Sequence, residues 1–223
     1  VRDGVGVLDL PGFSRFNLEG EGAAEWLRGR IAGALPKAGR MTLGYFPDSR
    51  GRILTEMSLI RHAEDHFTLI TAAPAQWHDY EVLKKDLPDG LSLTDHPTEF
   101  STLIVSGPKL RALFEELGAE ADLSLGWLTH QDAVVAGKAC RMLRVSFAGE
   151  LGWEVHAAMA DIPAIYDAVV GAGATPFGMY ALNSMRLEKG YRAWKGDLST
   201  DYTLFEGGLE RFIKLDKPQD FPG

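Results

Sequence analysis

The sequence predicts an α+β fold with antiparallel sheets, and two observations carry this prediction. Strand-like and helix-like runs alternate in clusters along the chain, which is typical of sheets packed against helices. Short polar connections of the hairpin kind separate the strand-like runs in residues 41–73 and again in residues 138–157. We therefore expect antiparallel sheets and no doubly wound parallel sheet.

Length and charge limit the classes of partner. The chain has 223 residues and is 45% hydrophobic, which allows one large domain or two intimately packed lobes. A net charge of −8 argues against a nucleic-acid surface, because phosphates require a basic stripe. No apolar run approaches the ~18 residues of a membrane span. The chain begins without Met and ends just after a strand-like run, so we expect a piece of a longer protein.

The first half reads as a strand, a helix, three strands and a second helix. Residues 14–20 alternate like a strand and lead into helical spacing over 22–35. Residues 41–72 give three strand-like runs, joined by the turn PDSRG and the polar connection HAEDH. Residues 74–87 follow as a helix, with Pro74 near its first turn.

The second half repeats this order. TLIVSGP predicts a strand, and PKLRALFEELG predicts a helix closed by Gly118. RVSFAGELGWEVHA, residues 144–157, reads as a strand, a tight glycine turn and a second strand. Two further helices are expected over 161–172 and 178–189, the second of them ending at Gly190.

The sequence lacks the residues that several common kinds of functional site require. GEGAAE at 20–25 has the setting of a dinucleotide fingerprint, but Glu25 replaces its last glycine and further acids would repel a pyrophosphate, so we interpret it as a strand-to-helix turn. The six histidines show no ligand spacing for a metal, and GxSxG is absent. The single cysteine, Cys140, reads as a small buried hydrophobe and suits a reducing compartment.

Two carboxylates stand among apolar neighbours on predicted strands. Glu56 lies in GRILTEMSLI, and Glu154 lies between Trp153 and Val155. Each is either a solvated outward residue or a buried group facing a cavity. Two such carboxylates favour a common cavity, in which burial would shift the pKa values of both. Two interpretations also remain for the stretch 183–197, which is either a capped helix with a charged face or part of a ligand site.

Five segments carry a resemblance to a known family. SMRLEKGYRAWKGDLS and the following LFEGGLERFIKLDK resemble the folate-binding core of the glycine-cleavage T-protein family, the aminomethyltransferases, especially the branch found in sarcosine and dimethylglycine dehydrogenases. VGVLDLPGFSRFNLEGEGAAEWL, GRILTEMSLIRHAEDHFTLITA and VSFAGELGWEVH fall in the same order as in that family. The resemblance covers essentially the whole chain.

The resemblance implies a domain plan. Residues 1–223 would form the folate-binding core as two interlocked α+β lobes, one from 1–40 with 138–223 and the other from 41–137. The family's C-terminal barrel lobe would be absent from this chain, as would the FAD domain of the dehydrogenases.

The resemblance also implies site residues. The family's pterin-binding Glu matches Glu154, and a buried carboxylate suits the pterin's paired N–H donors. By position in the resemblance, the cofactor would also contact a set of five further residues: Phe13, Leu43, Ile70, Phe147 and Arg211. Glu56 stands where the family usually has the catalytic Asp, and Phe147 stands where it usually has a tyrosine.

The function implied is tetrahydrofolate-dependent one-carbon transfer. In the fused enzymes a flavin oxidises an N-methyl amine, and tetrahydrofolate captures the carbon as 5,10-methylenetetrahydrofolate. The alternatives are a stand-alone aminomethyltransferase or demethylase, a non-catalytic folate-binding scaffold or regulator, and a degenerate remnant. Expected partners are folate, a one-carbon donor and an FAD-dehydrogenase domain, with no metal, nucleic acid or membrane. The expected compartment is the cytoplasm, or the mitochondrial matrix in a eukaryote.

Overall fold

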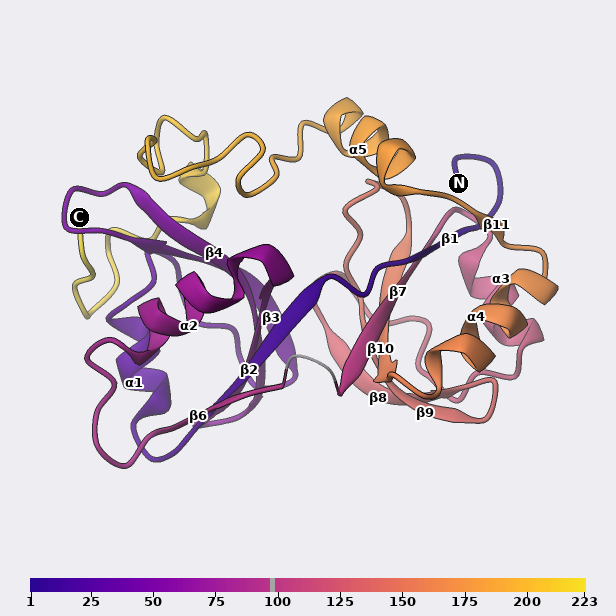
Figure 1. The fold of residues 1–223 in the computed structure, drawn as a ribbon, viewed down its shortest axis with the longest axis horizontal. Helices are drawn as coiled ribbons and strands as arrows, with labels where there is room; N and C mark the ends of the chain where they lie inside the picture. The colour runs from indigo at the N-terminus through magenta and orange to yellow at the C-terminus, as the bar shows by residue number, and fades with distance from the viewer. Residues whose placement is uncertain (97–98) are drawn as a thin grey trace. The chain divides into compact units, whose positions relative to one another are not determined.

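The computed structural model describes residues 1–96 and 99–223, and their contacts divide the chain into two units (Figure 1). Unit 1 comprises residues 1–13 and 97–191, and unit 2 comprises residues 14–96 and 192–223. Each unit is thus built from two separate stretches of the chain. No helix in the described residues is long and apolar enough to cross a membrane.

This division differs from the lobes expected from the sequence, which were 1–40 with 138–223 and 41–137. Strand pairing is the physical reason. The strand that begins at Phe13 joins the sheet formed by the 40–72 region, so residues 14–40 belong with that region. The strand Phe100–Ser106 instead pairs with Gly6–Asp9 and Gly152–Ala158, so residues 99–137 belong to unit 1.

Unit 1 is an α+β unit around a six-stranded sheet. Apart from a parallel pairing of the edge strand β11 with β1, the pairings within this sheet are antiparallel. Its strands, in spatial order, are β11 (Thr175–Pro176), β1 (Gly6–Asp9), β7 (Phe100–Ser106), β10 (Gly152–Ala158), β9 (Lys138–Leu143) and β8 (His130–Val135). Its helices are α3 (Leu110–Glu116), α4 (Ile162–Gly171) and α5 (Met179–Glu188).

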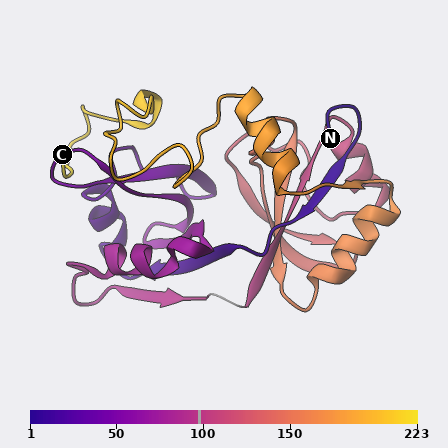
Figure 2. The same cartoon turned by 45° about the horizontal axis from the view of Figure 1, so that its top comes forward.

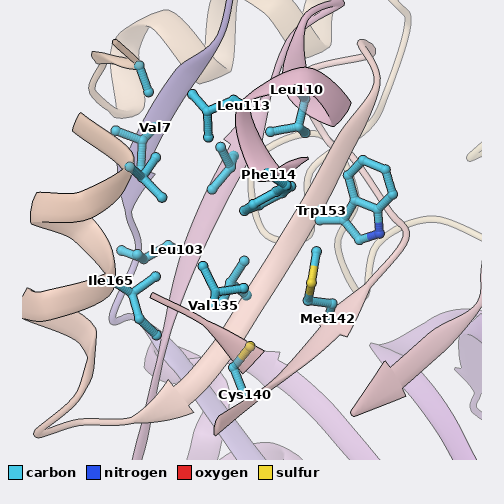
Figure 3. Packing of buried hydrophobic residues seen from close by; sticks show 14 of the residues in the cluster. Val7, Leu103, Leu110, Leu113, Phe114, Val135, Cys140, Met142, Trp153 and Ile165 are labelled. Carbon is cyan, nitrogen blue, oxygen red and sulfur yellow. The ribbon is translucent and has the colours of Figure 1, made fainter. Parts of the chain in front are cut away.

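Alternation along the strands gives this sheet two apolar faces. On one face Trp153 and Val155 of β10 pack with α3 and α4, and the Trp153 ring meets Phe114 edge to face at 6.0 Å (Figure 3). Figure 2 shows α4 running along this sheet. On the other face Leu8 and Ile104 form a smaller cluster with residues of α5. A carboxylate on β10 between two residues of the first face must therefore point to the second.

Unit 2 contains a five-stranded sheet. Its strands, in spatial order, are β3 (Arg40–Pro47), β4 (Ile53–Ala63), β5 (His66–Ala72), β2 (Phe13–Glu19) and β6 (Ser92–Asp95). Its helices are α1 (Ala23–Arg28), the 3-10 turn η1 (Ala73–Ala75), α2 (Gln76–Lys84) and the 3-10 turn η2 (Glu210–Phe212). The three strands predicted in residues 41–72 are confirmed, together with both of their connections.

The two faces of this sheet have different covers. The helical face packs apolar residues of β2–β5, such as Phe16 and Phe67, against Leu27 of α1 and Leu83 of α2. The opposite face is partly covered by the C-terminal stretch 192–223, which packs Leu198, Leu204 and Leu209 against Tyr45 and Ile53. Figure 1 shows this stretch, in yellow, lying over β3 and β4.

The α+β prediction is confirmed, whereas two local predictions were wrong. The helix expected over 22–35 ends at Arg28, with Gly29 as its C-cap. Beyond it the Ala32 N–H donates to the Tyr45 carbonyl and the Ala32 carbonyl accepts from the Lys214 N–H, which places this stretch beside β3. The first of the two strands expected within residues 144–157 is absent, and residues 144–151 form a loop. The backbone of Arg144 bonds to Leu128 and Thr129, and this draws the chain away from β10 before Gly152.

Candidate functional site

Glu154 lies on the face of the unit 1 sheet opposite Trp153 and Val155, as its alternation predicts. In register it stands between Ile104 of β7 and Leu143 of β9, and its side chain is only 13% exposed. The solvated alternative is thus wrong for this carboxylate. Glu154 is a mostly buried acid on an apolar sheet face.

The partner of Glu154 is a histidine that we did not predict. His156 Nε2 lies 3.0 Å from Glu154 Oε2, and His156 Nδ1 lies 3.1 Å from the Thr102 hydroxyl. His156 is 6% exposed and Thr102 is fully buried. The ring of Phe13 stacks on the imidazole, with centroids 6.5 Å apart and an interplanar angle of 25°. The predicted site residues Phe13 and Glu154 therefore meet through His156.

Phe147 lies in the loop that precedes β10 and packs against the same apolar cluster as Leu8 and Ile104. Its ring stacks on Tyr191 at 6.3 Å, and the guanidinium of Arg186 lies 5.8 Å from its centroid. Arg186 in turn donates to Asn183 Oδ1 and to the Tyr191 carbonyl. Arg186 is therefore a buried, hydrogen-bonded support for the aromatic pair. Other charged residues of the same stretch, such as Glu188 and Lys189, are exposed, so the capped helix also keeps a charged face.

Glu56 is the corresponding carboxylate of unit 2. It stands directly opposite Tyr45 in the β3–β4 ladder, and the two side chains form a hydrogen bond in which the phenol donates. The Glu56 Oε2 atom is buried, and no hydrogen-bond partner for it lies among the described residues 1–96 and 99–223. An acceptor in this position is available for a proton or for a ligand donor.

Burial decides the electrostatics of this pair. Loss of hydration raises the pKa of Glu56 to about 7, and the Tyr45 hydrogen bond acts in the opposite direction. Burial and the nearby Glu56 raise the pKa of Tyr45, which the positive charges of Arg211 and Arg192 oppose. Glu56 is therefore poised to gain or lose a proton near neutral pH.

The other predicted residues of unit 2 lie around this pair. Leu43 stands opposite Ser58, and Ser58 stands opposite Ile70, so these three side chains form one row across β3, β4 and β5. The row is two residues from the Tyr45–Glu56 pair and hence on the same face. Arg211 is exposed in η2, where its guanidinium lies 4.7 Å from the Phe212 ring centroid, and its charge acts on Tyr45.

The structure thus gathers the predicted residues into two groups. Phe13, Phe147 and Glu154 belong to unit 1, and Glu56 is in unit 2 with the remaining three predicted residues: Leu43, Ile70 and Arg211. The common cavity that the sequence predicts for the two carboxylates stays a prediction.

Sequence reasoning missed three residues that hold the carboxylates, namely His156, Thr102 and Tyr45. His156 had a usable signal, because a residue two positions along a strand from Glu154 shares its face. Thr102 and Tyr45 required knowledge of which strands pair and in which register, and a single sequence carries no direct sign of either.

A separate cavity of about 800 Å³ lies in unit 2 at the predicted strand-to-helix turn. Its lining contains none of the predicted site residues and is strongly acidic, with a single basic residue, Arg28. An anionic phosphate is a poor match for these carboxylates. In the part of the chain that the structure describes, no group of three or more His, Cys, Asp or Glu side chains could hold a metal ion.

Comparison with known proteins places these residues in context. A family model described as the GCVT N-terminal domain matches residues 1–217. Mitochondrial dimethylglycine dehydrogenase of Mus musculus is 32% identical over 232 residues, covering 100% of this chain and 27% of that protein. Mitochondrial sarcosine dehydrogenase of Homo sapiens is 31% identical over 248 residues, with the same two coverages.

A shorter relative and a solved structure agree with this. An aminomethyltransferase of Listeria innocua is 26% identical over 229 residues, covering 100% of this chain and 62% of that protein. The crystal structure of glycine cleavage system aminomethyltransferase T from Bartonella henselae has a TM-score of 0.85 at 23% identity, covering 96% of this chain and 59% of that one. The chain spans about a quarter of the length of the dehydrogenases it matches.

Proposed function

Because the chain belongs to the family of the GCVT N-terminal domain, we propose that it is a tetrahydrofolate-binding module for one-carbon transfer within an enzyme of the dimethylglycine or sarcosine dehydrogenase kind. The observation that carries the proposal is the state of Glu154, a mostly buried carboxylate held on an apolar sheet face. Burial of an acid costs free energy, and a ligand that donates to Glu154 beside His156 would offset part of that cost.

The residues present fit a pterin. The pterin's ring N–H and amino group form a donor pair that one carboxylate accepts with both oxygens. Glu154 Oε2 accepts one hydrogen bond from His156, and a carboxylate oxygen accepts two, so the group retains capacity for a donor pair. The neighbouring rings of Phe13 and Phe147 supply apolar surface of the kind that a flat heterocycle needs.

In this proposal Glu56 is the residue that moves a proton. Tetrahydrofolate supplies a nucleophilic nitrogen that takes up the one-carbon unit. Glu56, with a pKa of about 7 and an unpartnered oxygen, exchanges a proton at that nitrogen or stabilises positive charge on the one-carbon unit. Leu43 and Ile70 would exclude water beside it, and Arg211 would attract an anionic part of the cofactor.

Two departures from the family pattern define what this site does differently. Phe147 stands where a tyrosine is usual, so a hydroxyl is missing near the aromatic pair. Glu56 is one methylene longer than the usual Asp, and Tyr45 secures this longer side chain by a hydrogen bond. The proposed site thus depends on a tyrosine from β3 to orient its acid.

The test compares Glu154→Gln with Glu56→Gln in the complete enzyme. Glu154→Gln replaces one acceptor by a donor and is expected to weaken reduced-folate binding by about 1.5–3 kcal/mol. Glu56→Gln is expected to leave the affinity within a few-fold, while methylenetetrahydrofolate formation slows by on the order of 10²-fold or more. Calorimetric titration of a reduced folate gives the affinity, and assays of methylenetetrahydrofolate and of released formaldehyde give the rate.

The outcomes separate the roles. Equal loss of folate binding in both variants would show that the roles are assigned wrongly. No effect of either variant would favour a remnant without folate binding. Binding that depends on Glu154 in a protein without one-carbon transfer would favour the scaffold or regulator.

The match to aminomethyltransferases supports a second candidate, a stand-alone aminomethyltransferase or demethylase of the family. The dehydrogenase reading implies an FAD domain elsewhere in the same protein, which oxidises an N-methyl amine and supplies the one-carbon unit. Amine-dependent reduction of a bound flavin in the full-length protein would distinguish the two. The mitochondrial relatives support a mitochondrial location in a eukaryote, where the proposed compartment is the matrix; the cytoplasm is the proposed compartment otherwise.

A further inference from the structure

His156 is a buried histidine that lies between two polar side chains, Glu154 and Thr102. Its Nε2 lies 3.0 Å from Glu154 Oε2 and its Nδ1 lies 3.1 Å from Thr102 Oγ1. His156 stands opposite Thr102 in the β7–β10 ladder, so the backbone register itself aligns the imidazole with the hydroxyl. The ring of Phe13 covers the imidazole.

The chemistry of these groups fixes the direction of the hydrogen bonds. An ionised carboxylate can only accept, so the ring proton must reside on Nε2, which donates to Glu154. The neutral imidazole then has an acceptor at Nδ1, and the Thr102 hydroxyl can donate to it. Threonine has a stiff χ1, and at 0% exposure its hydroxyl has little room to turn elsewhere. The chain Thr102–His156–Glu154 is therefore polarised toward the carboxylate.

We propose that His156, held by Thr102, is the positioning residue that fixes the direction of the Glu154 carboxylate for its ligand, and so sets the affinity of the module for reduced folate. This rests on the proposed function, in which Glu154 accepts the pterin donors. A glutamate has three side-chain torsions, and a free carboxylate would lose that freedom only on binding. The histidine removes this freedom beforehand, which lowers the entropic cost of binding.

The affinity test uses the full-length protein titrated with 5-formyltetrahydrofolate, a stable reduced folate. His156→Leu removes the donor at similar volume and is expected to weaken binding by about 10-fold. His156→Gln, whose amide can donate from near the position of Nε2, should recover binding to within about threefold. Thr102→Val should weaken binding by about threefold, whereas the control Thr129→Val, which removes a hydroxyl bonded to Gly126 elsewhere in unit 1, should leave it unchanged.

A double-mutant cycle separates positioning from a general structural role. In a Glu154→Ala background, His156→Leu should change the affinity by less than about twofold, because the group it orients is gone. The same 10-fold loss in that background would overturn the proposal. So would a His156→Gln variant as weak as His156→Leu.

The contact itself is testable without folate. Nitrogen NMR of the unliganded protein at pH 8 should show His156 as the tautomer with its proton on Nε2, and Glu154→Gln should shift that resonance. The opposite tautomer would overturn the positioning role even if folate binds. A protein that shows the expected tautomer yet fails to bind 5-formyltetrahydrofolate would refute the proposed function and leave the His156–Glu154 contact intact.

Discussion

The carboxyl group of Glu56 titrates near neutral pH because its place in the fold removes water from it. Its unpartnered Oε2 atom is buried, and its one side-chain partner, Tyr45, offsets only part of the loss of hydration. The sequence alone singled out this residue by its apolar neighbours. Burial causes the rise in pKa, and its size also depends on Tyr45, eleven positions earlier, which the register of β3 and β4 brings opposite and which lowers the pKa.

Removal of the Tyr45 hydroxyl should raise the pKa of Glu56 further. In Tyr45→Phe the carboxylate loses the hydrogen bond that favours its ionised form, so its pKa should exceed the value of about 7. Carbon NMR of the glutamate side-chain carboxyl groups over a pH series measures this directly. Tyr166→Phe, a partly buried tyrosine of unit 1, is the control. A Glu56 pKa that falls or stays unchanged in Tyr45→Phe contradicts the assigned hydrogen bond.

The same group makes stability depend on pH. The pKa of Glu56 is raised from 4.5, the value expected in the unfolded chain, to about 7 in the folded protein. Its contribution to the free energy of unfolding is therefore fully present below pH 4.5 and is lost as the pH rises through 7. The shift corresponds to about 3 kcal/mol. As the pH rises from 4.5 to 8, the free energy of unfolding of Glu56→Gln should therefore increase relative to that of the wild type by up to that amount. Urea unfolding of both proteins measures it. A constant difference between the two proteins across this range would be the contrary result.

At the scale of elements, the connection from β7 to α3 relies on a glycine. Gly107 has φ +145°, and a Cβ there would lie 2.1 Å from the carbonyl oxygen of Gly4. Neither backbone segment can yield easily, since β1 and β7 are paired just beyond them. The sequence predicted TLIVSGP as a strand, whereas the close approach of residue 4 depends on the tertiary structure.

Gly107→Ala should consequently destabilise the protein by more than about 2 kcal/mol, since it combines strain in φ with a backbone clash. The matched control is Gly137→Ala in the β8–β9 turn, where φ is +72° but no atom lies within 4 Å of the added Cβ. That variant carries the backbone strain alone and should cost about 1 kcal/mol. Thermal unfolding of both variants decides the matter, and equal losses would mean that the contact with Gly4 is unimportant.

At the scale of the whole molecule, each unit is completed by a segment distant in sequence. Unit 2 draws Leu198, Leu204 and Leu209 from the C-terminal stretch, and these side chains cover Tyr45 and Ile53. The environment of Glu56 thus depends on residues about 150 positions later.

Leu204→Ala tests whether the C-terminal stretch stabilises the sheet of unit 2. Loss of a buried leucine costs about 2–5 kcal/mol, and the openings it promotes should lie in the sheet that Leu204 covers. Amide hydrogen exchange should therefore quicken in β3 and β4. Leu113→Ala, in the core of unit 1, is the control and should quicken exchange in the strands that α3 covers. Unchanged exchange of β3 and β4 in Leu204→Ala would show that the C-terminal stretch contributes little to unit 2.

The sequence by itself determined the α+β class, most of the strands and helices, and the face to which Glu154 points. These are local properties, because side-chain alternation and turn residues act over a few positions. The helix at 22–35 was predicted too long because the helical spacing of apolar residues continues past Gly29. There the backbone of Ala32 forms hydrogen bonds with Tyr45 of β3 and with Lys214 instead of helical ones. The first strand predicted within residues 144–157 was wrong for the same kind of reason, since hydrogen bonds of Arg144 to Leu128 and Thr129 replaced it with a loop.

Only the tertiary structure decided how the chain divides into units and which side chains hold the two acids. Both depend on strand pairing, and register between strands is set by burial of whole faces rather than by local sequence. Thr102 reaches His156 and Tyr45 reaches Glu56 through that register, over 54 and 11 positions along the chain. A charge among apolar residues can be found from sequence, but the partners that set its orientation and its pKa exist only once the sheets have formed.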